Sequence, residues 1–400
     1  MQHFKVCGGL LFLCLISCIG CRDSLLQLAE RQLTLSARKY DALAAATVDS
    51  VNLPRTATPD GKWVFAPPRW WTSGFVPGSL WQLYEYDRNP VRLEMARRFT
   101  AKVENEQYNT STHDLGFMLY CSFGNGYRIT GEAHYRDVLL TGARSLISRF
   151  HPLIGCIQSW PKNEKWQYPV IIDNMMNLEL LMWAFKQTGD STFAKICIRH
   201  ADRTIAEHFR PDYSTYHVVS YDTLTGRVQV KNTAQGAFDE SVWARGQTWG
   251  LYGFTMLYRE TGLSRYLNQA QKIADFLISH PAMPADGVPY WDFNAPGIPN
   301  AERDASAAAI MASALLELGS FSDRDQRRRY HRFAEKQIRS LSTPRYFAQP
   351  GENGHFLLMH GVGHKPHNSE VDVPLTYADY YYIEALMRYR RMAGDRDVDS

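Results

Sequence analysis

A short phrase that closes one apolar stretch after another constrains the fold of this chain more than any other feature. The phrase reads aromatic-x-x-Thr-Gly and occurs at 127–131, 185–189 and 258–262, with weaker equivalents near Tyr86-Asp87 and Gly319-Ser320. Glycine readily adopts the left-handed conformation that ends a helix, and the polar residues after it can begin the next one. Each interval between phrases is long enough for two helices and a loop. The chain therefore reads as a series of helical hairpins.

Apolar residues at three-and-four spacing support this reading. They run through 178–187, 249–259, 305–318 and 377–390, as expected for helices packed on a core. The intervals are too long and uneven for a 34-residue tetratricopeptide array. Five or six hairpins predict an all-α chain, either an open solenoid or a closed toroid, whose long loops gather at one end and build a site. Because no linker interrupts residues 22–400, we predict one domain there.

The first 21 residues form a separate unit. Lys5 precedes an apolar run, Val6–Ile19, that is short for a membrane span. Leu15-Ile16-Ser17-Cys18 resembles a bacterial lipobox, and Cys21 is a second candidate for lipidation. We expect a leader over 1–21 and an exported protein, periplasmic or an outer-membrane lipoprotein of a Gram-negative bacterium. The alternatives are an ordinary cleaved signal peptide or an uncleaved anchor.

Charge and cysteine content exclude several classes. The formal net charge is only +3, so nucleic acid is not expected as a partner. Outside the leader, three cysteines remain, Cys121, Cys156 and Cys197. Their wide spacing fits neither a disulfide framework nor a zinc cluster, and we expect small buried side chains.

Two aspartates stand in apolar frames. Asp114 lies before Leu115-Gly116-Phe117, and Asp173 follows Ile171-Ile172. Burying a carboxyl group costs free energy unless it is paired, and the cost is tolerated mainly where a raised pKa serves a general acid. A polar neighbour adjoins each, His113 in one case and Asn174 in the other. The alternative for each aspartate is a helix cap or an arginine pair.

The helix that begins at Asp173 adds a second consideration. Asp173 and Asn177 lie at i and i+4, so one helix face presents an acid and an amide together. Free N–H groups at the helix start lower the pKa of Asp173, whereas apolar neighbours raise it. The sequence leaves the outcome open.

Tryptophans on loops suggest a carbohydrate site. Trp71 and Trp160 stand beside small or polar residues, where an indole can stack on a sugar ring; the alternative is a place in the core. Arg245 and Trp249 share a helix face at i and i+4, which suits a clamp for a carboxylated sugar or, alternatively, a structural Arg–Trp stack.

Four histidines, His355, His360, His364 and His367, lie within thirteen residues. Glycines and Pro366 make this segment a loop without the helical register that converges two imidazoles. We therefore predict a ligand-lining loop and no metal site.

Together these pieces resemble the unsaturated glucuronyl hydrolases of glycoside hydrolase family 88. The resemblance runs from about Trp70 to Arg390. It rests on both aspartate frames and on five further motifs, listed here in chain order: Ser159-Trp160, Tyr216-His217-Val218-Val219, Thr233-Ala234-Gln235-Gly236, Ala244-Arg245-Gly246-Gln247-x-Trp249 and Tyr377-Ala378-Asp379-Tyr380-Tyr381. It implies an (α/α)6 barrel that needs no cofactor.

The resemblance also implies a reaction. The family removes 4,5-unsaturated glucuronic acid from the non-reducing end of lyase-generated glycosaminoglycan oligosaccharides, by hydration of the C4=C5 vinyl ether. Asp173 is then the general acid/base and Asp114 the second essential carboxylate. The substrate-binding residues implied are His113, Trp71, Trp160, Asn174, His217, Gln235, Arg245 and Trp249, with Arg245 holding the uronate carboxylate. The family's run for sulfated substrates is not recognisable here, and its counterpart is 364–370.

Three other functions remain open on sequence grounds. An unsaturated rhamnogalacturonyl hydrolase shares the barrel and the chemistry, although the His113-Asp114 frame and the Arg245/Trp249 pair favour the glucuronyl enzyme. A non-catalytic sugar-binding surface lipoprotein needs aromatics but not two apolar-framed acids. An inverting glycosidase needs two carboxylates as well.

Overall fold

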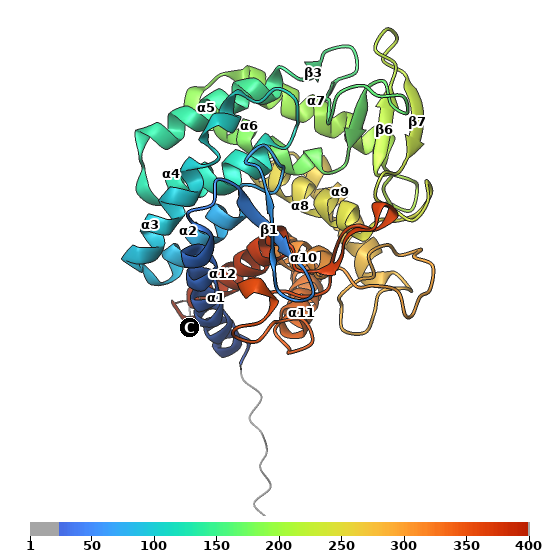
Figure 1. The fold of residues 1–400 in the computed structure, drawn as a ribbon. Coiled ribbons are helices and arrows are strands. Elements are labelled where there is room, and N and C mark those ends of the chain that lie inside the picture. Colours follow the sequence, from blue (N-terminus) through green and yellow to red (C-terminus); the bar gives the residue numbers. More distant parts are fainter. Residues whose placement is uncertain (1–23, 399–400) are drawn as a thin grey trace, which may run out of the picture.

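Helices alternate between an inner and an outer position along the chain, as Figure 1 shows in a view where the sequence colours run around the ring. The computed structural model describes residues 24–398, so the predicted leader over 1–21 lies outside the described residues. The predicted domain boundaries therefore stay a prediction. Among residues 24–398, no helix combines the length and apolar content needed to cross a membrane.

Six inner segments form a closed ring, because each contacts the next and the last contacts the first. They are α2 (Phe75–Asp87), the π-helical η2 (Gly116–Gly124) continued by α4 (Asn125–Thr130), α6 (Asn174–Thr188), α8 (Ala244–Thr261), α10 (Ala305–Ser320) and α12 (Thr376–Val398). Six outer helices pack behind them: α1 (Leu25–Thr47), α3 (Pro90–Ala101), α5 (Ala133–Ile147), α7 (Ser191–His208), α9 (Ser264–Ser279) and α11 (Arg324–Leu341). The predicted (α/α)6 barrel is confirmed, and the open solenoid is wrong.

Burial explains which helices lie inside. Almost every residue of α10 is buried, and many are alanine, so the helix is apolar on all sides. α11 instead buries one stripe and exposes the rest. A helix that is apolar all round belongs in an interior, whereas an amphipathic one covers it. The two kinds therefore sort into the inner and outer rings.

The predicted helix ends are largely correct. Gly131, Gly189 and Gly262 each take the left-handed conformation after α4, α6 and α8. The end expected near Gly319-Ser320 differs, because Phe321 closes α10 in the right-handed conformation. Gly319 serves close packing instead, since a Cβ there would lie 2.3 Å from His331 Nε2.

Connections at the two ends of the barrel differ in length. Each of the first five inner segments passes to the next outer helix through two or three residues, whereas the six connections from an outer helix to the next inner segment span 48–74, 102–115, 148–173, 209–243, 280–304 and 342–375. The long connections all lie at the amino-terminal ends of the inner segments, which we call the wide mouth. We call the opposite end the far mouth. The expected gathering of long loops at one end is therefore observed.

Short strands and turns stiffen the wide mouth. The pairs are β1 (Leu53–Ala57) with β2 (Trp63–Ala66), β3 (Phe150–His151) with β4 (Cys156–Ile157), and β8 (Gly361–His364) with β9 (Ser369–Val373). A three-stranded sheet orders β5 (Pro169–Ile171), β6 (Val218–Tyr221) and β7 (Val228–Asn232) antiparallel. The 3₁₀ turns are η1 (Glu104–Tyr108), η3 (Asn353–His355) and η4 (Lys365–His367).

Candidate active site

Both predicted acids lie at the wide mouth, each at the start of an inner segment. Asp173 is the residue before α6, and Asp114 precedes η2. The negative charge of Asp114 raises the pKa of Asp173, so the two carboxyl groups act on each other in the same space. The structure thus brings together two residues that are 59 positions apart in the chain.

Asp173 is held as a weak acid. Its side chain is only 11% exposed, and burial, opposed by the charge of Arg245 and reinforced by Asp114, raises its pKa to about 7. Oδ2 has no hydrogen-bond partner among the described residues, and the side chain makes no capping bond to its own helix. The predicted contest between helix start and burial is therefore decided by burial.

His217 presents an N–H to this acid. The backbone N–H groups of Ala234 and Gln235 each donate to its Nδ1, at 3.1 Å. Burial also holds the pKa of His217 well below its usual value. The neutral ring must therefore carry its proton on Nε2, which lies 3.6 Å from Asp173 Oδ2. The loop that follows β7 thus fixes the tautomer.

Asp114 is oriented by its own tripeptide. Thr112 Oγ1 donates to one carboxylate oxygen at 2.7 Å, and His113 Nε2 lies 3.2 Å from the other. Burial lowers the pKa of His113, which favours the neutral ring with a single N–H donor. The predicted His113-Asp114 unit therefore exists as a contact, and Thr112 is a partner that the sequence reading missed.

Two amides on α6 have different tasks. Asn174 is buried, donates through Nδ2 to Ile157 O at 3.0 Å, and leaves its Oδ1 without a partner among the described residues. Asn177 Oδ1 accepts the backbone N–H of Phe117 at 2.9 Å. The helix face expected to present an acid with an amide thus uses Asn177 to attach α6 to η2.

Arg245 is engaged inside the protein. Its Nη1 pairs with buried Asp304 at 2.9 Å and also donates to Val362 O, while its Nη2 donates to Gly363 O at 2.6 Å. The guanidinium lies 4.5 Å from the Trp243 ring centre. The sequence left open a sugar clamp or an Arg–Trp stack; a stack is present, but on Trp243.

The predicted aromatic residues lie at the wide mouth, Trp71 and Trp160 in two of its connections and Trp249 in the second turn of α8. Trp249 is fully buried, packs on Phe117 at 5.0 Å between ring centres, and keeps an Nε1 without a partner among the described residues. Trp71 is half-buried against Tyr377 at 4.9 Å. Trp160 is half-buried beside Trp166 at 5.3 Å.

Gln235 connects two loops of the wide mouth. Its Nε2 donates to Gly363 O at 2.9 Å, the same carbonyl that Arg245 Nη2 reaches. The β8 hairpin is thereby tied to the loop that holds His217, although 128 positions separate Gln235 from Gly363.

Asp304 and Tyr377 are site residues that the sequence reading missed. Asp304 caps α10 by accepting the N–H of Ser306 and turns its other oxygen to Arg245. An aspartate directly before a long apolar helix is a recognisable cap, but its ionic partner lies 59 positions away. Tyr377 was noted only as part of a motif.

The four histidines do not converge. His360 Nδ1 lies 2.6 Å from Asp372, His364 and His367 stack with ring centres 4.0 Å apart, and His355 packs near Trp63. Within residues 24–398, no group of three or more His, Cys, Asp or Glu side chains is placed to hold a metal ion. The three cysteines outside the leader are free and buried, as expected.

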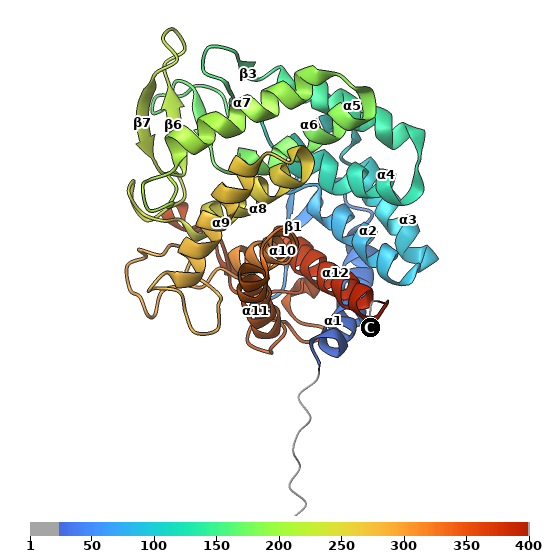
Figure 2. The same ribbon diagram turned by 180° about the vertical axis from the view of Figure 1, so that it is seen from behind.

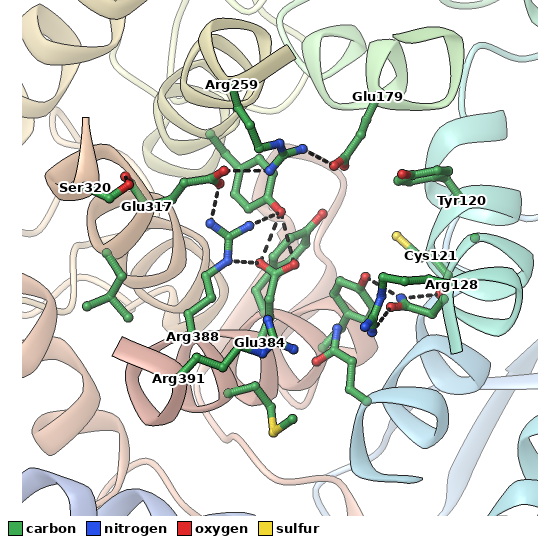
Figure 3. Close-up of a pocket in the computed structure, with 18 of the residues that line it drawn as sticks. Tyr120, Cys121, Arg128, Glu179, Arg259, Glu317, Ser320, Glu384, Arg388 and Arg391 are labelled. Carbon is green, nitrogen blue, oxygen red and sulfur yellow. Dashed lines mark hydrogen bonds and ion pairs between the residues drawn. The ribbon is translucent and has the colours of Figure 1, made fainter. Parts of the chain in front are cut away.

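A cavity of about 490 Å³ lies at the far mouth (Figure 3). Arg259 bridges Glu179 and Glu317, and Arg388 joins Glu317 to Glu384. Burial raises the pKa of Glu179 to about 7. None of the ten residues predicted for the site lines this cavity. These ion pairs link α6, α8, α10 and α12 to one another. Figure 2 shows the same four helices from the side opposite to that of Figure 1.

The fold and the site together define a class. Asp173 has a pKa near neutrality, and a second carboxylate lies beside it at the wide mouth of an (α/α)6 barrel. Such a pair of carboxyl groups is typical of glycoside hydrolases.

Family models give no match to the chain. An unsaturated glucuronyl hydrolase of Formosa agariphila is 43% identical over 357 residues, covering 88% of each chain. An unsaturated chondroitin disaccharide hydrolase of Streptococcus pneumoniae is 32% identical over 348 residues, 84% of this chain and 86% of that one.

Solved structures agree with these relatives. The crystal structure of an unsaturated glucuronyl hydrolase specific for heparin superposes with a TM-score of 0.89 at 47% identity, covering 92% of this chain and 98% of that chain. The chain belongs to the unsaturated glucuronyl hydrolase family.

Proposed function

We propose that this chain removes 4,5-unsaturated glucuronic acid from the non-reducing end of glycosaminoglycan oligosaccharides made by lyases. The observation that carries the proposal is Asp173, whose raised pKa of about 7 keeps a proton available at neutral pH. Its Oδ2 is buried and makes no hydrogen bond to the described residues, so no protein acceptor takes up the proton that the acid carries. The relatives' names supply the substrate class.

The proposed reaction begins with a proton. Protonated Asp173 delivers it to C4 of the C4=C5 double bond, and the oxygen of a water molecule bonds to C5. The resulting carboxylate then takes the proton that the water loses, so the acid is regenerated. One water has been added across the double bond. The hemiketal at C5 collapses to a ketone: its C5–O5 bond breaks, O5 gains the proton that the C5 hydroxyl loses, and the ring opens. The hemiacetal left at C1 then breaks down to an aldehyde, and the next sugar leaves as an alcohol.

The neighbouring groups have distinct proposed roles. His217 directs its Nε2–H toward Asp173 and stabilises the carboxylate that forms after proton transfer. Asp114 orients the substrate and, by like charge, keeps the Asp173 pKa high. Arg245 contributes its positive charge to binding the uronate carboxylate. Substrate contacts are assigned to His113, Trp71, Trp160, Asn174, Gln235 and Trp249.

Heparin-derived fragments are the preferred substrates in this proposal. The heparin-specific relative is 47% identical, whereas the chondroitin-disaccharide relative is 32% identical. We expect higher kcat/KM on unsaturated heparin disaccharides than on unsaturated chondroitin disaccharides. The reverse order would contradict the heparin preference while leaving the reaction type intact.

The reaction type is tested with the ultraviolet absorbance of the C4=C5 bond. Wild-type protein should remove the absorbance of an unsaturated disaccharide and leave a saturated control uncleaved. Asp173→Asn should lose activity about 1000-fold, within the range of about 100- to 10,000-fold that one general acid usually contributes. Because the protonated acid is required, kcat/KM should fall about tenfold per pH unit above pH 7. Binding of the uronate anion raises the Asp173 pKa further, so kcat should fall at a higher pH than kcat/KM.

Each alternative has its own result in that assay. Equal cleavage of the saturated substrate would indicate an inverting glycosidase. Tight binding with persistent absorbance would indicate a sugar-binding lipoprotein. Faster turnover of unsaturated galacturonyl-rhamnose than of any glucuronyl substrate would indicate the rhamnogalacturonyl enzyme.

We further propose that the protein is exported and lipidated in a Gram-negative envelope. The support is the lipobox-like run before Cys18, with Cys21 as the second candidate. Metabolic labelling with an alkyne fatty acid tests it: Cys18→Ala should abolish labelling if Cys18 carries the lipid, and Cys21→Ala if Cys21 does. Labelling that survives in the double variant, or is absent in the wild type, would reject the anchor.

A further inference from the structure

Helix α11 carries an excess of positive charge. Its 18 residues include seven Lys or Arg and two Asp or Glu, a formal net charge of +5, whereas the whole chain has +3. The rest of the chain is therefore net negative. The charge that would attract a polyanion is gathered on one outer helix, away from the acids of the wide mouth.

Packing does not require these cations. The stripe that α11 buries consists of Tyr330, His331, Phe333, Ala334, Gln337, Ile338 and Leu341. Arg324, Arg328, Arg332 and Lys336 instead follow each other at i, i+4 spacing and are all exposed; we call these four residues the basic row. Like charges at this spacing weaken a helix. The repulsion within the basic row thus lowers the stability of α11, and binding of an anionic ligand would relieve it.

Few acids neutralise the basic row. Arg328 pairs with Asp325, while among the described residues no carboxylate makes an ion pair with Arg324, Arg332 or Lys336. The Arg328 side chain remains 61% exposed in its pair. An exposed pair of this kind is weak and is readily exchanged for a stronger anion.

The basic row borders a groove with an apolar floor. The groove, of about 580 Å³, lies between α9 and α11. It is lined by the apolar Ile278 and Phe333, by three members of the basic row (Arg328, Arg332 and Lys336), and by Arg329 and Asp325. Lys336 Nζ lies 4.7 Å from the Phe333 ring centre. A sugar ring offers an apolar face and, when sulfated or carboxylated, anions around its edge. An apolar floor with a cationic rim therefore suits an acidic sugar better than an isolated phosphate.

The row also has a direction. α11 returns antiparallel to α10 through residues 321–323, so its amino end lies at the far mouth and its carboxyl end points to the wide mouth (Figure 2). At 1.5 Å per residue, the four cations span about 18 Å along the barrel wall. A chain that follows the basic row is led toward the end of the barrel that holds Asp173.

We propose that the basic row and its groove bind a sulfated, uronate-bearing polysaccharide chain outside the active site. The bound chain keeps the protein on the polymer whose lyase-made ends are processed at the wide mouth. This exosite makes no contact with the two acids, and its existence does not depend on the proposed reaction.

A binding experiment on the full chain tests the exosite. The probe is a size-defined saturated heparin decasaccharide, which has no C4=C5 bond and so is not turned over. The test variant is Arg328→Gln/Arg332→Gln/Lys336→Gln. The control variant removes the same charge from exposed positions on α3, α5 and α7: Arg98→Gln/Arg144→Gln/Lys195→Gln. Circular dichroism checks that both fold, and Kd is measured by calorimetry between 20 and 200 mM salt.

The test variant should bind at least tenfold more weakly than the control, and its slope of log K against log salt should be smaller by about two to three, as counterion release predicts for that many lost contacts. Turnover of an unsaturated disaccharide, too short to span both places, should match the wild type. Equal Kd values for the two variants would overturn the exosite. Binding to phosphatidylglycerol vesicles that depends on the basic row, without decasaccharide binding, would overturn it in favour of a membrane surface.

Discussion

Replacing Asp173 with asparagine should make the protein more stable at neutral and alkaline pH while destroying activity. The pKa of this carboxyl group is about 7 in the folded chain, against 3.8 for an unperturbed aspartate. Between pH 3.8 and pH 7, the Asp173 carboxyl group therefore binds more protons in the folded chain than in the unfolded chain. The free energy of unfolding then falls as the pH rises through this range. Above pH 7 the full cost is about 4 kcal/mol, from about 1.4 kcal/mol per unit.

The cost is specific to ionisation and therefore changes with pH. At pH 5 the Asp173 carboxyl group lowers the free energy of unfolding by about 2 kcal/mol and at pH 8 by about 4 kcal/mol, by the same linkage relation. Asparagine is neutral at both. The stability difference between Asp173→Asn and the wild type should therefore increase by about 2 to 3 kcal/mol from pH 5 to pH 8. The 11% exposure of the side chain keeps the discount for solvent small.

Urea unfolding followed by tryptophan fluorescence, at both pH values, measures this difference. An exposed aspartate on α5, Asp137→Asn, is the matched control, since its side chain is 71% exposed. The difference in the free energy of unfolding from the wild type should increase from pH 5 to pH 8 for Asp173→Asn and stay constant for Asp137→Asn. A gap that stays within about 0.5 kcal/mol across the pH range, well below the linkage value, would refute the buried, protonated state on which the mechanism depends.

Two further substitutions probe the support of the site. Gly116→Ala would place a Cβ 2.5 Å from Asn177 Cα, and we expect it to lower the free energy of unfolding by more than about 2 kcal/mol; Gly131→Ala, with nothing within 4 Å, should cost about 1 kcal/mol through its left-handed backbone. Asp304→Asn removes the counter-charge of Arg245, so the catalytic acid should ionise more readily. Its kcat/KM should begin to fall at a lower pH than in the wild type, and an unchanged pH profile would contradict this coupling.

Much of the fold was predictable because helix ends are local. The left-handed glycines at 131, 189 and 262 stand where the repeated phrase places them, since the preference depends on the residue itself. Closure of the ring was supplied by the family resemblance. Contacts between α12 and α2 join residues about 300 positions apart, and hydrophobic spacing carries no information on them.

The burial of the predicted acid Asp173 could be read from the sequence, whereas the contacts that surround it could not. Asp173 stood out because its apolar neighbours are sequence neighbours, so burial was visible locally. The engagement of Arg245 by Asp304 and the β8 hairpin was not visible, because those partners come from connections far along the chain. The same limit hid the donors that fix the His217 tautomer. Long loops meet at the wide mouth through tertiary packing, and no local pattern encodes which of them touch.

The direction of the inner helices bears on how one mouth can bind an anion and still keep the Asp173 carboxyl group protonated. All six inner segments begin at the wide mouth, so their positive dipole ends face it and favour an anion there, each by up to about 1 kcal/mol. That field alone would hold every carboxyl group ionised. Asp173 escapes because it makes no capping hydrogen bond and is buried, and its pKa rises in spite of the field. The mouth can therefore attract a uronate and keep one acid protonated, and the arriving negative charge strengthens the hold on that proton.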